Sequence, residues 1–448
     1  MTDRQHEYDV IIIGGGPAGA TAGLQLGRAG KKVLILEKQR FPRFHVGETM
    51  LPAVLKMVSD LGLRDRFEAL PHIDKHGAEF GFGDTADADT LRFGFTSALT
   101  PGPLDTFNVE RKLFDGLLLD AAREAGAEVR ESSRVTSIDR LAHHDVAVTV
   151  DGQTITAKWL LDASGQAAVV GRHLKTKRVI ASLRNTAFFG HFTGVKRLAD
   201  DQEGYPSIVM CDEGWFWIIA INPTVTSCGV VLNQQAIRKA GVPRDQMLRW
   251  AAERCPLVAR RLEHATFPKA NNVNSDYTYT CEPYAGDGYF LIGDSATFLD
   301  PIFSTGVGLG MYGGIESARL IGQIDDGQTD ARAAQDEYIR LVRGSSKHLF
   351  QLVHSYYSHT FRELMMNGTG PVQMHRSIIS LLAGHVFPKA QWKVVWRFKA
   401  MQYASVLQRF LPLVPRHKRF SLLASEPVSL PGPHAQPTPI AEPVTALA

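Results

Sequence analysis

Residues 8–19, YDVIIIGGGPAG, decide the fold of this chain. A short apolar run that predicts a β-strand enters a glycine-rich turn, and a helix-compatible segment follows. Gly14, Gly16 and Gly19 fit the spacing G-x-G-x-x-G. In that motif the first glycine permits the tight turn, the second lets backbone approach a pyrophosphate, and the third lets helix pack on strand. The stretch therefore predicts a dinucleotide-binding unit with phosphate at the helix N-terminus.

A carboxylate follows at the expected distance. The second apolar run, residues 32–36, ends in Glu37, which lies 18 residues after Gly19. An acid at this place accepts hydrogen bonds from ribose hydroxyls and disfavours a 2′-phosphate. The nucleotide is therefore FAD or NAD rather than NADP. The alternative, a glycine-rich turn without ligand, does not account for the acid.

Composition sets the outer limits. The chain has 448 residues, 44% of them hydrophobic, which predicts two or three domains. A net charge of +3 does not favour a nucleic-acid partner. The N-terminus lacks the pattern of a signal peptide, and no apolar run reaches the ~18 residues of a membrane span. The four cysteines show no metal-ligand spacing. We therefore expect a cytoplasmic chain with reduced thiols, no metal and no membrane partner.

Residues 41–52, FPRFHVGETMLP, form a loop by their proline and glycine content. This loop resembles the one after the second strand in flavin-dependent halogenases, of the phenol- and pyrrole-type branch of the FAD-dependent aromatic monooxygenase superfamily. The resemblance covers about residues 8–330 and implies that the nucleotide is FAD. The FAD-binding residues indicated by the glycine motif and the resemblance together are Gly14, Gly16, Ala18, Gly19, Glu37, Lys38, Arg43, Gly47, Glu48, Arg111, Asp162, Gly165, Asp294, Pro301 and Gly306.

Three further segments carry the resemblance toward FAD. Arg111, at the start of a predicted helix, resembles the superfamily arginine that touches the flavin side chain, although a helix-surface cation is the alternative. WLLDASG, residues 159–165, resembles a second, weaker dinucleotide motif. Asp294 follows a buried-looking strand, and in FAD monooxygenases this aspartate meets the ribityl hydroxyls, for which a carboxylate is a suitable acceptor.

Lys75 is singled out only by the resemblance. A lone lysine is normally a solvated surface residue. Here KHGAEF, residues 75–80, matches the halogenase pattern K-x-G-A-x-F. In that family this lysine carries the active halogen, as a chloramine or as hydrogen-bonded hypohalous acid. Burial would lower the pKa of the amine and make its nucleophilic neutral form accessible.

The run GWFWIIA, residues 214–220, reads as a strand. Alternation puts Trp215 and Trp217 on one face and Phe216 on the other. The alternative interpretation is that the two tryptophans simply pack in the core of the sheet. The run resembles the halogenase stretch W-x-W-x-I-P, which keeps organic substrate away from the flavin and so suppresses hydroxylation. Ala220 stands where the family has proline.

The run DPIFSTGVG, residues 300–308, precedes a predicted helix. Backbone N–H groups in such a turn form an anion-binding nest. The resemblance implies that halide binds at Ser304, Thr305 and Gly306, and the alternative is a flavin-contact turn without halide. Phe303 stands where tryptophan halogenases carry a glutamate that helps the cationic ring intermediate. We therefore expect a phenol- or pyrrole-like substrate, activated by its own heteroatom.

The expected fold class is α/β, with a Rossmann-like FAD-binding domain, an antiparallel β-sheet substrate domain and a C-terminal helical region. The expected ranges are 1–80, 105–178 and 270–330 for FAD binding, 81–104 and 179–269 for the sheet, 331–425 for the helices, and 426–448 for a Pro-rich disordered tail. Helices are predicted over 330–367 and 374–420. Most aromatic residues there, including Trp392 and Tyr403, are expected to be packing core.

These observations predict an FAD-dependent halogenase that uses oxygen and chloride or bromide. Because only one strong dinucleotide motif is present, reduced FAD is expected from a separate flavin reductase. The substrate is a small aromatic, either free or on an acyl carrier protein. Lys389, Lys393 and Arg397 recur every four residues, as a basic helix face for an acidic carrier or simply a solvated face. The alternatives are a flavin monooxygenase, a geranylgeranyl-type reductase, and a catalytically silent FAD-binding protein.

Overall fold

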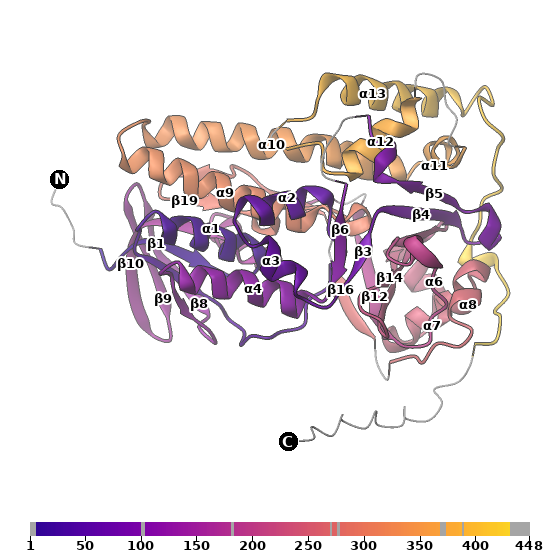
Figure 1. Cartoon of the computed structure of the whole chain (residues 1–448), viewed down its shortest axis with the longest axis horizontal. Helices are drawn as coiled ribbons and strands as arrows, with labels where there is room; N and C mark the ends of the chain where they lie inside the picture. Colours follow the sequence, from indigo (N-terminus) through magenta and orange to yellow (C-terminus); the bar gives the residue numbers. More distant parts are fainter. Residues whose placement is uncertain are drawn as a thin grey trace, which may run out of the picture.

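The computed structural model describes residues 6–99, 104–180, 183–268, 271–275, 278–367, 373–387 and 389–430. Figure 1 shows two sheets toward opposite ends of the long axis, with helices α10 to α13 along one long side. The strands are β1(Tyr8–Ile13), β2(Val33–Leu36), β3(His72–Lys75), β4(Gly77–Phe82), β5(Leu91–Gly94), β6(Thr106–Val109), β7(Glu128–Arg130), β8(Val135–Ala142), β9(Asp145–Val150), β10(Gln153–Asp162), β11(Lys177–Val179), β12(Asn185–Phe192), β13(Ser207–Met210), β14(Gly214–Ala220), β15(Thr226–Asn233), β16(Asn272–Ser275), β17(Tyr279–Cys281), β18(Ala285–Gly286), β19(Tyr289–Leu291) and β20(Thr297–Phe298). The α-helices are α1(Pro17–Arg28), α2(Pro52–Asp60), α3(Arg64–Glu68), α4(Arg111–Glu124), α5(Val169–His173), α6(Gln234–Ala240), α7(Met247–Glu253), α8(Pro256–Arg261), α9(Gly306–Asp325), α10(Ala331–Tyr356), α11(His359–Met366), α12(Met374–Leu382) and α13(Trp392–Leu407).

The nucleotide-binding sheet has the strand order β18-β19-β10-β1-β2-β7, with β9 and β8 added beside β10. β1 is parallel to both β2 and β10, and all three are buried apolar runs in their shared part. Such runs suit a sheet that is covered on both faces. Helix α1 packs against α4 and α9. This arrangement confirms the Rossmann-like domain and sets the glycine turn at the carboxyl end of β1.

The second sheet has seven strands in the order β16-β12-β15-β14-β13-β4-β5. Its pairs are antiparallel except β13 with β4, which is parallel. Its two faces pack in different cores: Trp215 and Trp217 belong to the large core, and Phe216 belongs to a smaller one with α7 and α8. The predicted alternation is thus confirmed.

Two strands of this sheet, β4 and β16, extend into ranges that were expected to belong to the FAD-binding domain. The boundary at residue 80 lies within β4, and the expected return to the FAD-binding domain at 270 precedes β16, which pairs with β12. Each of these strands pairs with a strand more than 80 residues away in the chain, β4 with β13 and β16 with β12. The composition of the sequence does not predict such long-range pairing. β3 and β6 form a separate two-stranded ladder, and a bridge between Thr49 and Asn108 connects β6 to the loop after β2.

The C-terminal helices are shorter than predicted. The helix expected over 374–420 is two helices, because the chain turns at Gly384, whose φ is +83° and where a Cβ would lie 2.4 Å from Ala53 Cβ. The helix expected over 330–367 breaks at Ser358, whose backbone is extended. Within the described ranges no helix combines the length and apolar character needed to cross a membrane.

The expected disordered tail needs one correction. Val428 N–H donates to Glu253 O, and Leu430 is buried in the smaller core. This segment is therefore attached to the molecule through the Val428 backbone and the Leu430 side chain, while residues 426–429 are exposed. The rest of that expectation, 431–448, lies outside the described residues.

Candidate functional site

A cavity of about 760 Å³ lies where the two sheets meet the C-terminal helices. Its lining comes from the glycine turn, the loop after β2, the inner face of β14, the turn before α9, and Leu382 of α12. This volume is within the range of small-molecule and cofactor sites, which form where domains meet. The cavity is thus the candidate active site.

The glycine turn is built for close approach. Gly14 has φ +103°, and a Cβ there would lie 2.4 Å from Ala163 O. A Cβ on Gly19 would lie 2.0 Å from Gly14 O, so the start of α1 rests directly on the turn. The Glu37 carboxylate accepts from Gly15 N–H and Gln39 N–H, both at 2.8 Å. These bonds hold the acid in the cavity wall, where ribose hydroxyls would meet it.

Two arginines share one buried acid beside this turn. Arg111 forms a two-bond pair with Asp115, at 2.7 and 3.0 Å, and Arg43 Nη1 lies 3.2 Å from the same carboxylate. Two cations on one anion leave a net positive charge. A Cβ on Gly16 would lie 3.3 Å from Arg43 Nη2, so this charge faces the glycine turn. The donor set fits an FAD pyrophosphate, with Arg43 as its cation.

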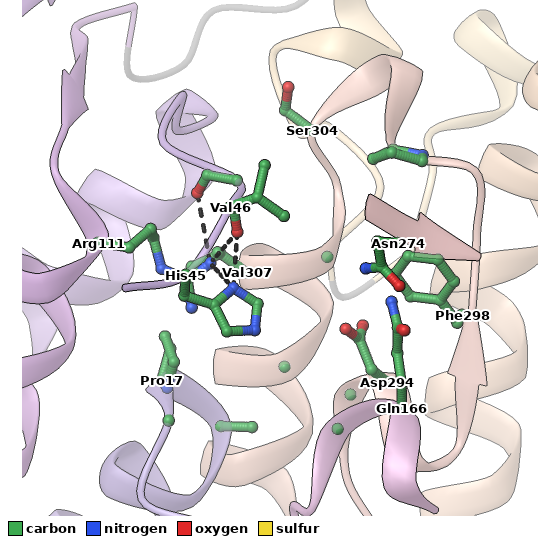
Figure 2. A pocket seen from close by; sticks show the side chains of 18 of the residues that line it. Pro17, His45, Val46, Arg111, Gln166, Asn274, Asp294, Phe298, Ser304 and Val307 are labelled. Atoms are coloured by element: carbon green, nitrogen blue, oxygen red, sulfur yellow. Dashed lines mark hydrogen bonds between the residues drawn. The ribbon is translucent and has the colours of Figure 1, made fainter. Parts of the chain in front are cut away.

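The loop carrying Arg43 is fixed from the other side by Arg111. Arg111 Nη1 donates to Val46 O at 2.9 Å and lies 3.3 Å from His45 Nδ1. Figure 2 shows His45, Val46 and Arg111 together, across the cavity from Gln166 and Asp294. The enclosed position of Asp294 raises the pKa of its carboxyl to about 6, although the Arg111 charge lowers it somewhat.

Lys75 lies at the end of β3 and is only 2% exposed. Its Nζ donates to Met50 O at 2.8 Å and lies 5.5 Å from the centre of the Phe95 ring. Burial lowers the pKa of its ammonium to about 7, because a charge is poorly solvated there. A large fraction of this amine is therefore neutral and nucleophilic near neutral pH.

The paired tryptophans stand in the same cavity wall. The ring centroids of Trp215 and Trp217 are 5.7 Å apart, and Phe189 continues the row 5.8 Å beyond Trp217. Trp217 Nε1 donates to Ser227 Oγ at 3.2 Å, which fixes the ring in the wall. Phe189 of β12 and the two tryptophans of β14 thus form a continuous aromatic surface.

The turn before α9 supplies backbone donors. Ser304 has φ +56° after the short helical turn Pro301–Phe303, and α9 begins at Gly306. Ser304 and Gly306 line the cavity. The 20-residue α9 presents its positive end here, where an anion would be stabilised. The geometry is therefore suited to a small anion.

Comparison with known proteins connects this geometry to a family. The profile described as "FAD binding domain" matches residues 7–333. A tryptophan 2-halogenase of Chondromyces crocatus is 30% identical over 78% of this chain and 67% of its own length. A 1H-pyrrole-2-carbonyl-[peptidyl-carrier protein] brominase of Pseudoalteromonas luteoviolacea (strain 2ta16) is 31% identical over 88% of this chain and 95% of its own. The chain belongs to the flavin-dependent halogenases.

The fold of this halogenase agrees with that assignment. The solved structure of the flavin-dependent brominase Bmp2 superposes with a TM-score of 0.76 at 28% identity, covering 89% of this chain and 99% of Bmp2. FAD and halide are the family's cofactor and co-substrate, as the resemblance implied. Among the residues that the structure describes, no group of three or more His, Cys, Asp or Glu is placed to hold a metal ion. The four cysteines of the halogenase are free and buried.

The cavity gathers most residues expected at the site. The expected residues that line it are Gly14, Gly16, Ala18, Glu37, Lys38, Arg43, Gly47, Glu48, Lys75, Arg111, Gly165, Trp215, Trp217, Asp294, Pro301, Ser304 and Gly306. Three expected residues lie behind the lining. Gly19 serves helix packing, Thr305 is buried at the start of α9, and Asp162 is fully buried.

Asp162 needs a physical correction. Its carboxylate accepts from Ser164 N–H at 3.0 Å and Val170 N–H at 2.7 Å. It therefore holds the turn between β10 and α5 together, and does not face the cofactor space. Asp162 acts on the cavity only through the turn that contains Gly165.

Other lining residues were missed from the sequence. They include Phe95, Gln166, Asn274, Phe298 and Leu382, from five separate parts of the chain. Gln166 directly follows the small-residue motif that ends at Gly165, and the other four stand in no predicted motif, so the tertiary fold brings them to the halogenase cavity. Phe95 matters most, because its ring faces the Lys75 ammonium.

A buried acid begins the turn that precedes α9. Asp300 accepts from the Tyr357 hydroxyl at 2.6 Å, from Asn185 Nδ2 at 3.2 Å and from Ile302 N–H at 3.3 Å. Burial raises the pKa of its carboxyl, although these donors favour the charged form. Phe303, where tryptophan halogenases have glutamate, is 4% exposed and packs edge-on against Tyr356 at 5.4 Å.

Proposed function

We propose that this halogenase transfers electrophilic halogen from Lys75 to a phenol- or pyrrole-like ring. The observation that carries the proposal is the buried Lys75 amine, with its pKa near 7, in one cavity with the tryptophan pair and with Ser304 and Gly306 of the turn before α9, which is the proposed halide turn. Reduced FAD, when bound, would supply the two electrons that reduce oxygen to the peroxide level, and oxygen at that level would oxidise halide to hypohalous acid. A separate flavin reductase is part of the proposal, supported by the single strong dinucleotide motif. So is a cytoplasmic location, supported by four free thiols.

The halogen reaches the ring in two steps, by way of the Lys75 nitrogen. The lone pair of the neutral amine forms a nitrogen–halogen bond as the oxygen–halogen bond of hypohalous acid breaks. The released hydroxide takes a proton from the nitrogen and leaves as water. The ring then attacks the halogen, the nitrogen keeps the electron pair of the nitrogen–halogen bond, and the proton that the ring loses returns to the nitrogen and restores the neutral amine. Alternatively, the ammonium form donates a hydrogen bond to hypohalous acid and makes its halogen more electrophilic.

The other residues of the cavity prepare this transfer. Met50 O fixes the Lys75 nitrogen, while the Phe95 ring keeps water from it. Trp215 and Trp217 form a barrier that separates organic substrate from the flavin, and so favour halogenation over direct oxygen transfer. Excluding water also protects hypohalous acid from loss to bulk solvent.

The substrate class rests on Phe303. With an apolar ring in place of the glutamate of tryptophan halogenases, the site offers less help to a cationic ring intermediate. A phenol or pyrrole stabilises that cation with its own heteroatom. The carrier-protein brominase, which is 31% identical over 88% of this chain, acts on a pyrrole, and this similarity supports a pyrrole-type substrate.

The experiment is mass spectrometry of a phenol and pyrrole panel, each free and carrier-tethered where the chemistry allows. Each compound is incubated with enzyme, flavin reductase, FAD, oxygen, and chloride or bromide. A halogen isotope pattern that Lys75→Ala abolishes is expected. An added oxygen would indicate a monooxygenase, and a saturated double bond would indicate a reductase. FAD retention without oxidation of reduced flavin above background would indicate a silent binding protein.

Carrier docking is a finer proposal, prompted by the basic side chains near α13. Lys389 precedes the helix, so only Lys393 and Arg397 lie one turn apart on it, which corrects the three-residue face expected from the sequence. Reversing the charge at Lys389, Lys393 and Arg397 should slow turnover of a tethered substrate and spare a free one, with an effect that weakens as salt rises. Equal effects on both substrates would contradict carrier docking.

A further inference from the structure

Helix α13 has an apolar side that faces solvent. Val394, Phe398 and Met401 bury the inner side of the helix against the core. The outward side chains of the helix and the segment after it, together called here the outer stripe, are Trp392, Tyr403, Val406, Leu407, Phe410, Leu411 and Leu413. Each of them is 49–78% exposed. A surface helix normally turns polar residues outward, so this exposure requires an explanation.

The outer stripe lies in a region of one charge sign. Residues 364–425 contain nine lysines and arginines and no aspartate or glutamate. Lys399 lies within the stripe, since residues 392, 396, 399 and 403 follow helical spacing along one side. Arg409 is exposed at its far end. A partner that covers the stripe must therefore accept both apolar side chains and positive charge.

A second copy of the chain does not meet this requirement. A two-fold contact would place each basic stripe against its own equivalent, and like charges would face one another across the interface. An acidic protein would satisfy the charge. It would also need a concave surface matched to side chains that project one by one from an outer helix. Figure 1 shows α13 at the outer edge of the molecule, beyond α12.

We propose that the outer stripe binds the surface of a membrane that contains anionic lipids. Tryptophan, tyrosine, phenylalanine and leucine side chains enter the boundary between headgroups and acyl chains, and lysine and arginine pair with lipid phosphates. A lipid surface adapts to projecting side chains, so no matched shape is needed. The expectation of no membrane partner rested on spanning segments, and a helix that lies on a membrane needs none. This inference does not depend on the proposed chemistry.

The test is co-sedimentation of the full chain with vesicles. Two kinds are used, phosphatidylcholine alone and phosphatidylcholine with 30% phosphatidylglycerol. We expect binding to the anionic vesicles at low salt and at least about tenfold weaker binding at 0.5 M salt. The double variant Phe410→Ser with Leu411→Ser should lose at least about tenfold in partition coefficient. The matched control, Val179→Ser with Val273→Ser, removes two exposed apolar side chains elsewhere and should bind as wild type does.

Several results would overturn the proposal. A wild-type chain that stays in the supernatant with anionic vesicles at low salt is one. Equal loss of binding in the stripe variant and in the control is another. The third would come from sedimentation velocity. If the wild-type chain is a dimer, the stripe variant is a monomer and neither binds vesicles, the outer stripe is the contact with a second copy of the chain. Vesicle binding needs neither FAD nor halide, so failure of the halogenation assay leaves this test unaffected.

Discussion

Replacing Lys75 with methionine removes an ionisable group from the buried wall of the cavity. An unfolded lysine has a pKa of 10.5, and burial lowers the pKa of Lys75 to about 7. Each pH unit between these values corresponds to about 1.4 kcal/mol, so burying this lysine costs folding about 4 kcal/mol at pH 7. Leaving Met50 O without a donor offsets about 1–2 kcal/mol. The Lys75→Met variant should therefore be more stable than wild type at pH 7, by about 2–3 kcal/mol, and make no halogenated product.

The sign with pH is part of the prediction. The folded pKa is depressed, so the cost is fully present below about pH 7 and disappears as pH rises toward 10.5. The advantage of the methionine variant should shrink by about 2 kcal/mol between pH 7 and pH 9. Urea unfolding of the FAD-free proteins measures this, because bound FAD would add its own stabilisation.

The matched control is Lys56→Met, at an exposed helix lysine paired with Asp60. Its stability should change by less than about 1 kcal/mol at either pH. A Lys75→Met variant that is less stable than wild type at both pH values would refute the buried neutral amine. Halogenated product at near wild-type rate from that variant would return Lys75 to a structural role.

Three further predictions test other parts of the cavity. Replacing Trp215 and Trp217 together with phenylalanine keeps the sheet packed but thins the barrier, so hydroxylated product should appear by mass spectrometry; unchanged products from a folded, FAD-loaded variant would contradict the barrier. The pKa of Asp294 is about 6, so FAD affinity of the wild type should rise from pH 5 to pH 8 and that of Asp294→Asn should not; parallel fluorescence titrations would contradict its contact with FAD. Gly14→Ala should strain the turn by about 1–3 kcal/mol, because its Cβ would lie 2.4 Å from Ala163 O, and should therefore lower the melting temperature and weaken FAD binding. Normal flavin absorbance of the purified variant would contradict the role of this turn in FAD binding.

Sequence alone predicted the parts of the site whose chemistry is local. The turn at Gly14 and the acid at Glu37 follow from steric and hydrogen-bonding needs within one βαβ unit. The common face of Trp215 and Trp217 follows from strand alternation. Lys75 was found only through a family resemblance, because a lysine among polar neighbours such as Asp74 and His76 has no local signal of burial.

The partners of these residues could not be predicted. Met50 O lies 25 residues from Lys75, and Tyr357 lies 57 residues from Asp300. Such pairs depend on how the two sheets and α10 meet, which no local pattern encodes. The aromatic residues of α13 show the same limit. Phe398 is buried as expected, but Trp392 is 78% and Tyr403 is 73% exposed, since periodicity does not reveal which face finds a partner.

The hydrogen bond from Tyr357 to Asp300 bears on how halogenases of this type can be recombined. The match to the FAD-binding profile ends at residue 333, which invites a crossover there in chimeras that exchange the C-terminal helices. Such a crossover would separate Tyr357 from Asp300, the acid directly behind the halide turn. A donor helix without a hydroxyl at this place leaves a buried carboxyl short of a partner and loosens the turn that chloride or bromide would occupy. The exchangeable unit therefore runs from β20 through Tyr357, the residue that follows α10, so that the tyrosine stays with its aspartate when chimeras are built across residue 333.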